Sequence, residues 1–156
     1  MTGPGGAAGG FYDPATGSFC GGGNAAFTQA NAILGLVAAD NPACPVPPKA
    51  VAFLAGLQDT SGPGTGGWQA DGVINTNSTS MALMAQAAVH VSGANAVFAF
   101  LHSQQDPSTG GFAFTTLGSF DSTASDPDSD ALVIQGLEAA GQDPGSGSDK
   151  GGYIAG

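Results

Sequence analysis

A doubled glycine followed by an aromatic residue is the feature that most restricts what this chain can fold into. The pattern occurs four times in 156 residues, at 9–11, 66–68, 110–112 and 151–153. Self-similarity at intervals of about 40 to 57 residues is typical of repeat proteins, in which each unit covers the apolar face of its neighbour. We therefore predict a single domain, residues 1–156, with units at about 9–58, 59–105 and 106–150 and a fourth unit beginning at 151.

Two shifts of the sequence against itself support these units. A shift of 101 residues aligns three pairs of segments, 9–11 with 110–112, 17–19 with 118–120, and 30–39 with 131–140. A shift of 47 residues places Phe53, Leu54, Gln58 and Asp59 on Phe100, Leu101, Gln105 and Asp106. Matches of this kind, found without gaps, indicate related units.

Each unit is predicted to be a hairpin of two α-helices. A polar, glycine-rich loop leads into a helix of small residues, and a short break precedes a second helix. In the middle unit we expect the N-cap among Asn77, Ser78 and Thr79. The predicted helices at 25–39, 78–91 and 128–140 are apolar almost all round, as suits an inner layer, whereas those at 49–58 and 95–105 have the narrower stripe of an outer layer. The predicted fold class is all-α, with stacked αα-hairpins.

The charge of the chain excludes several classes of partner. Twelve acidic residues stand against only Lys49 and Lys150, which gives a net charge of −10. Without a basic stripe the chain is a poor ligand for nucleic acid or an anionic membrane surface. No apolar stretch reaches the roughly 18 residues of a membrane span. The scarcity of lysine favours an exported or surface-attached bacterial protein, with a cytoplasmic one as the alternative.

The segment FLAGLQDTSGPGTGGW, residues 53–68, resembles the QW motif of squalene cyclases and other terpenoid cyclases. Its matching residues are Phe53, Leu54, Gln58, Gly62, Gly66 and Trp68, and the copy at 100–112 keeps Phe100, Leu101, Gln105, Gly110 and Phe112. Over essentially the whole chain the units resemble the prenyltransferase and squalene-cyclase repeat. The resemblance implies an (α/α) toroid, normally a ring of six hairpins, of which three units would form a half-toroid arc.

The resemblance also implies a structural role for the motif residues. The glutamine at the end of an outer helix, Gln58 or Gln105, would bond to the backbone of the loop, while the aromatic ring, Trp68 or Phe112, packs over the neighbouring unit. The glycines, including Gly66 and Gly110, suit a loop that needs a positive φ and a close backbone approach. We interpret these residues as a clasp between helices, in preference to ligand contacts.

The acidic segment SDPDSDAL, residues 125–132, is the sharpest candidate for chemistry. Terpenoid cyclases that protonate an alkene use Asp-x-Asp-Asp, and Asp126 and Asp128 fit its start before Ser129 breaks it. The alternating Asp126, Asp128 and Asp130 also suggest a weak calcium candidate, although Ala131 stands where such a loop needs glycine. The matching residues 75–78 are uncharged, so a helix cap is the interpretation that we prefer.

Other constellations point to no metal and no cofactor. The protein prenyltransferases, whose repeat these units resemble, hold zinc with Asp, Cys and His, but His90 and His102 are far in sequence from Cys20 and Cys44. A predicted helix separates the two cysteines, so we expect two free or separately paired thiols. No thioester segment, phosphate loop or nucleophile motif is found in the sequence.

Two functional classes follow from these observations. We favour a non-catalytic α/α-toroid module of an exported protein, which serves assembly or the binding of a small apolar ligand. The alternative is a fragment of a terpenoid cyclase or prenyltransferase-like enzyme that acts on isoprenoids. Because three hairpins would leave apolar faces at both ends, the expected partner is a second copy in head-to-tail contact or the remaining half of a toroid.

Overall fold

The computed structural model describes residues 12–19, 25–117 and 124–144, and this part of the chain is mostly helical. It contains the α-helices α1 (Ala25–Ala39), α2 (Pro48–Gly56), α3 (Thr76–Ala88), α4 (Asn95–Ser103) and α5 (Pro127–Ala139). A single 3₁₀ turn, η1 (Gly62–Gly64), lies in the loop after α2. The prediction of a mainly helical chain is confirmed, while the glycine patterns at 9–11 and 151–153 and the segment 118–120 lie outside the described residues.

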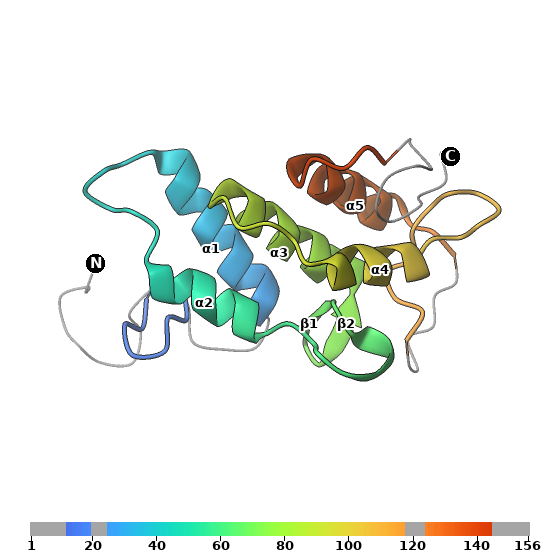
Figure 1. Ribbon diagram of the computed structural model, residues 1–156, viewed down its shortest axis with the longest axis horizontal. Helices are drawn as coiled ribbons and strands as arrows, with labels where there is room; N and C mark the ends of the chain where they lie inside the picture. The colour runs from blue at the N-terminus through green and yellow to red at the C-terminus, as the bar shows by residue number, and fades with distance from the viewer. Residues whose placement is uncertain (1–11, 20–24, 118–123, 145–156) are drawn as a thin grey trace.

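The helices lie in two layers (Figure 1). Helix α3 is at the centre of one layer and packs against α1 on one side and α5 on the other. The predicted inner helices correspond to α1, α3 and α5, and the predicted outer helices to α2 and α4. Helix α2 contacts α1, and α4 contacts α3, so each outer helix lies against the inner helix that precedes it in the chain. Since α3 has neighbours on several sides, residues all around it are buried, which agrees with its lack of a polar face.

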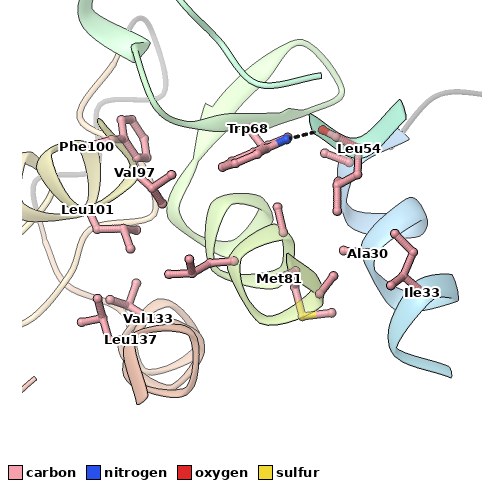
Figure 2. Close-up of a cluster of buried hydrophobic side chains, with 14 of the residues drawn as sticks. Ala30, Ile33, Leu54, Trp68, Met81, Val97, Phe100, Leu101, Val133 and Leu137 are labelled. Atoms are coloured by element: carbon pink, nitrogen blue, oxygen red, sulfur yellow. Dashed lines mark hydrogen bonds between the residues drawn. The ribbon is translucent and has the colours of Figure 1, made fainter. Parts of the chain in front are cut away.

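The hydrophobic core follows the contacts between the layers (Figure 2). Trp68 lies at its centre, between Leu54 of α2 and the α4 side chains Val97 and Phe100. Met81 of α3 lies on the side of Ala30 and Ile33 of α1, while Val133 and Leu137 of α5 lie on the other side of α3. All of these side chains are buried or nearly so, with Trp68 at 0% exposure.

A small β-hairpin interrupts the helices, and the sequence analysis missed it. Strands β1 (Trp68–Ala70) and β2 (Val73–Asn75) pair antiparallel, with Ala70 opposite Val73. Asp71 and Gly72 form the two-residue turn with φ of +51° and +80°. Positive φ at both turn positions is the type I′ geometry that an Asp-Gly pair favours. The sequence of residues 64–72 suggests only a glycine-rich loop, and that interpretation is therefore wrong.

The ends of the inner helices share one backbone feature. Asp40, His90 and Gly141 follow α1, α3 and α5 and have φ of +42°, +59° and +73°. After α3 and α5 the chain closes the helix with a bond back to the last turn, from Val91 N to Gln86 O at 2.8 Å and from Gln142 N to Leu137 O at 2.9 Å. A left-handed residue with such a bond is a common helix stop, which explains why α3 ends at 88 and not at the predicted 91.

Candidate functional site

Three loops that precede the inner helices make the same two backbone hydrogen bonds. The first loop is 12–19, the second loop is 58–68 and the third loop is 105–112. In each, an aspartate N–H donates to the carbonyl oxygen of the residue before the aromatic, from Asp13 to Ser18, Asp59 to Gly67 and Asp106 to Gly111, at 2.8, 2.9 and 2.8 Å. A glycine N–H then donates back to the aspartate carbonyl, from Gly17, Gly66 and Gly110, at 2.8 Å in all three.

The aspartate side chains stabilise the first turn of each loop. Each carboxylate accepts a hydrogen bond from the backbone N–H two residues later, at Ala15, Ser61 and Ser108. This is an Asx-turn, a frequent use of aspartate in loops. Hydrogen bonds from the Thr16 hydroxyl to Asp13 and from the Ser108 hydroxyl to Asp106 are the main causes that lower the pKa of these two carboxyls.

The glycine at the turn of each loop has a left-handed backbone. Gly17, Gly66 and Gly110 have φ of +88°, +95° and +78°. A Cβ atom at Gly17 would be 2.2 Å from Lys49 O, and one at Gly66 would be 2.1 Å from Ala96 O. Because Lys49 and Ala96 lie in the first turns of the outer helices α2 and α4, the first and second loops each pack directly on the start of the next outer helix. The predicted close approach at Gly66 is therefore present.

The predicted glutamine contacts are present in the structure. Gln58 Nε2 donates to Gly66 O at 3.0 Å, and Gln105 Nε2 donates to Gly110 O at 2.7 Å. Each glutamine also forms a β-bridge with the aromatic residue of its loop, Trp68 or Phe112. These contacts are the clasp that the sequence predicts.

The first loop obtains the same bond from a residue that the sequence analysis missed. Gln29, fully buried on the inner helix α1, donates through Nε2 to Gly17 O and to Ala50 O, both at 2.9 Å. Gln29 on an inner helix thus bonds to Gly17, the counterpart of Gly66, whereas Gln58 follows an outer helix. Phe19 is the aromatic of this loop, whereas the shift of 101 residues assigned that place to Phe11. The only signal for Gln29 is a glutamine in a helix of mostly apolar residues.

A side chain of each inner helix accepts the N–H of the aromatic residue. Phe19 N donates to Gln29 Oε1 at 2.8 Å, Trp68 N to Thr79 Oγ1 at 2.9 Å, and Phe112 N to Asp130 Oδ1 at 2.5 Å. An amide, a hydroxyl and a carboxylate thus serve the same purpose. Asp130, a weak calcium candidate in the sequence, uses a carboxylate oxygen to hold the third loop.

Trp68 makes one further bond that ties its loop to the preceding outer helix. Its indole Nε1 donates to Leu54 O at 2.7 Å, in the last turns of α2 (Figure 2). A buried indole N–H normally finds a partner, and here the partner is a backbone carbonyl in the last turn of a helix, which also accepts from Leu57 N at 3.2 Å. The ring itself packs toward α4 of the next hairpin, as the sequence analysis expects of a clasp residue.

Asp126 is the N-cap of α5. Its Oδ1 accepts from Asp128 N and Ser129 N, both at 3.0 Å, and the Ser129 hydroxyl donates to Oδ2. Burial acts to raise the pKa of Asp126, but the hydrogen bonds from Ser129 and Asp128 outweigh it and lower the pKa below its ordinary 3.8. An alkene-protonating acid needs the opposite, a carboxyl held in its protonated form. The Asp128 side chain is exposed.

The preferred cap interpretation is thus confirmed at Asp126, and its counterpart on α3 is Asn75. Asn75 Oδ1 accepts from Ser78 N at 2.8 Å, so the prediction that the cap lies among Asn77, Ser78 and Thr79 is wrong. The cap lies earlier than predicted because strand β2 ends at Asn75, which is extended and directly precedes the first turn of α3. Thr76 follows the cap and connects the start of α3 to the segment between α4 and α5, because its N–H donates to Phe114 O at 2.9 Å.

The remaining candidates do not gather into a site. Among the described residues, no three His, Cys, Asp or Glu side chains lie close enough together to hold a metal ion. His90 is exposed at the end of α3, and His102 is exposed in the last turn of α4. Cys44 is a free thiol, while Cys20 lies outside the described residues.

One hollow opens at the opposite ends of the inner helices from Asp126. It has a volume of about 370 Å³ and lies between the C-terminal ends of α3 and α5 and the residues that lead into α4. His90, Phe98 and Gln142 line it with small residues and backbone. Separately, no helix in the described part of the chain is long and apolar enough to cross a membrane.

No family model matches this chain, and no curated protein or solved structure was found to be similar to it.

Proposed function

We propose that this chain is a non-catalytic module of αα-repeats, related to the prenyltransferase and squalene-cyclase repeat, whose hairpins form an arc of an (α/α) toroid and which serves assembly. The observation that carries the proposal is the set of bonds shared by the three loops. The same two backbone hydrogen bonds form at Asp13, Asp59 and Asp106, and this supports three equivalent units. Side chains of these loops act on the backbone of the protein itself, as expected of residues that hold neighbouring units together.

The environment of Asp126 favours this module over the enzyme alternative. In a cyclase the acid must be protonated when substrate arrives, yet the bonds from Ser129 and Asp128 stabilise the charged form. Ser129 Oγ also lies 2.9 Å from the amide oxygen of Asn77 on α3, so the polar groups at this end join one inner helix to the next. Their chemistry is that of caps and inter-helix contacts.

The sequence suggests two roles for the module, assembly and the binding of a small apolar ligand, and ligand binding has less support. The hollow beside His90 has the volume of a small-molecule pocket, but it is open, and its apolar side chains besides Phe98 and Val91 are alanines. A buried apolar cavity would be expected for an isoprenoid. The features of the described residues therefore support assembly as the role that we propose, and the scarcity of lysine is the basis for proposing an exported protein.

A turnover assay tests the proposal against the enzyme alternative. The purified chain is incubated with squalene, and separately with farnesyl diphosphate and Mg²⁺, and products are separated by gas chromatography with mass detection. We expect no product above the protein-free blank, for the parent chain and for Asp126→Asn. A product that forms with the parent chain and with Asp128→Asn, but not with Asp126→Asn, would contradict the proposal and identify an acid catalyst.

A further inference from the structure

The three inner helices can be compared position by position. Equivalent residues are spaced 50 residues from α1 to α3 and 51 from α3 to α5. The acceptors of the aromatic N–H set this register, at Gln29, Thr79 and Asp130. The left-handed residues at 40, 90 and 141 give the same spacing independently.

One face of each inner helix points toward the inner helix that follows it. Ile33 on α1 and Leu83 on α3 are both fully buried, but their counterpart on α5, Ile134, is 41% exposed. Ala30 and Ser80 are likewise fully buried, whereas Ala131 is exposed. Among the described residues no further inner helix follows α5. The face of α5 that carries Ala131 and Ile134 therefore has no inner helix packed on it.

A second face of α3 and α5 points toward the preceding inner helix, and the equivalent face of α1 has no preceding inner helix among the described residues. Gly136 of α5 lies against α3 so closely that a Cβ atom there would be 3.2 Å from Ser80 Cα. Its counterpart on α3, Ala85, is buried. The counterpart on α1, Gly35, is exposed, and a Cβ atom there would meet nothing within 4 Å. The face of α1 with Gly35 and its neighbour Asn31 is therefore open.

We propose that the open face of α1 in one copy of this chain packs on the open face of α5 in a second copy, as α5 packs on α3 within one copy. In this contact Gly35 takes the place of Gly136, and Ala131 takes the place of Ser80. The occupant is a second copy because the two open faces repeat the two sides of an interface that the chain already forms. The contact is head-to-tail, so it leads to a ring or to a filament. This inference rests on the proposed assembly role.

The charges of the two faces fit this contact. Helix α1 contains no acidic or basic residue, so the exposed acidic side chains of α5, Asp128 and Glu138, meet no like charge on it. The net charge of −10 on each copy still opposes association at long range. Added salt screens that repulsion, so we expect association to strengthen as the salt concentration rises.

The first test uses Gly35→Leu, with Gly56→Leu as the matched control. Both glycines lie in exposed helical positions where a Cβ atom would meet nothing within 4 Å, so both variants should fold at least as well as the parent. Sedimentation velocity at micromolar concentration should show oligomers for the parent chain and for Gly56→Leu, and monomers for Gly35→Leu. A monomeric parent chain, or a Gly35→Leu variant that associates like the parent, would overturn the inference.

The second test traps the contact covalently. Within one copy, a Cβ atom at Gly136 would be 3.2 Å from Ser80 Cβ, close to the spacing of about 3.5–4.5 Å in disulfides. In a background of Cys20→Ser and Cys44→Ser, Gly35→Cys chains mixed with Ala131→Cys chains should form a mixed disulfide dimer under mild oxidation. Gly56→Cys chains mixed with Ala131→Cys chains should not, and equal yields from the two mixtures would overturn the inference.

The outcome separates the inference from the proposed function. If the chain is monomeric and also converts no isoprenoid substrate, only the second-copy contact fails and the repeat module stands. If it converts an isoprenoid in an Asp126-dependent way, the proposed function fails whatever its state of association.

Discussion

The second and third loops reach the same backbone geometry with different side chains. Both have the bond between glutamine Nε2 and glycine carbonyl, and both have a left-handed glycine. The second loop adds an indole bond, from Trp68 to Leu54 O, and continues into the β1–β2 hairpin. After the third loop, the described residues form one antiparallel β-bridge, between Ala113 and Ser125. The phenyl ring of Phe112 carries no N–H group that could donate a bond like that of the Trp68 indole. The comparison teaches that the backbone fixes the loop, while the aromatic decides how firmly it is tied to the preceding helix.

The two loops also differ in the charge of the group that anchors them. The Thr79 hydroxyl accepts Trp68 N–H, whereas the Asp130 carboxylate accepts Phe112 N–H. A hydrogen bond to a charged acceptor is stronger than a neutral one, and Asp130 therefore offsets part of what the third loop lacks. The predictions below test this comparison, beginning with the largest expected effect.

Removal of the aromatic rings should have the largest effect, and it should be unequal. Trp68→Ala should lower the free energy of unfolding by about 4 kcal/mol or more, and Phe112→Ala by about 3 kcal/mol, because only Trp68 also loses a buried hydrogen bond. Urea denaturation of both variants measures the difference. A loss below about 1 kcal/mol for Trp68→Ala would show that the ring is not a packed core residue.

Substitution of the turn glycine should separate steric contact from backbone strain. Gly66→Ala should cost about 3 kcal/mol, since the new Cβ would meet Ala96 O at 2.1 Å and φ is +95°. Gly62→Ala is the control, because it has a positive φ but open space around it, and it should cost about 1 kcal/mol. Thermal denaturation of both gives the comparison. Equal losses would mean that the loop does not press on α4.

Loss of the clasp glutamines should have a moderate effect that is similar in the two loops. Gln58→Ala and Gln105→Ala should each lower stability by about 1–2 kcal/mol, because each leaves a glycine carbonyl without its donor. Gln135→Ala, at an exposed position of α5, is the control and should change stability by less than about 0.5 kcal/mol. Equal stability of all three variants would contradict the clasp.

The smallest effect is expected at the cap of α5. Asp126→Ala should cost about 1 kcal/mol at neutral pH, and Asp126→Asn less than about 0.5 kcal/mol, because Asn caps a helix about as well. The double variant Asp126→Asn with Asp128→Asn should likewise stay folded. If calcium raised the melting temperature of the parent chain but not of the double variant, these residues would bind the metal.

The pH dependence of the cap has a definite sign. The pKa of Asp126 is lower in the folded chain than its ordinary 3.8, so its contribution to stability is present above that value and is lost as the pH falls through the folded pKa. Asp126→Asn should therefore lose less stability than the parent between neutral pH and the acid range. An identical acid loss in both would contradict the lowered pKa.

Much of the helical layout could be predicted from the sequence because its signals are local. The bounds 25–39 agree with α1, and the predicted outer helices end within two residues of α2 and α4. Apolar periodicity and the breaks at proline and glycine suffice for such elements. The clasp contacts were also predictable, because Gln58 and Trp68 belong to a spaced motif that the family resemblance interprets.

The parts that were missed depend on contacts between distant residues or on very short elements. Strands of three residues are too short to show alternation, and the Asp71-Gly72 turn was the one available signal. Gln29 replaces an outer-helix glutamine from an inner helix, and no local pattern encodes that exchange. Likewise, Asp130 could be recognised as acidic, but its bond to Phe112 N becomes visible only once the loop has folded back on α5.

Hydrogen exchange of the loop amides tests most directly whether the three loops are equivalent. The amides of Gly17, Gly66 and Gly110 each donate to an aspartate carbonyl, and those of Phe19, Trp68 and Phe112 each donate to an inner-helix side chain. We predict that all six exchange slowly, with the second loop the most protected because of the additional Trp68 bond. Exchange of any one loop at the rate of an unfolded peptide would contradict the equivalence of the three units.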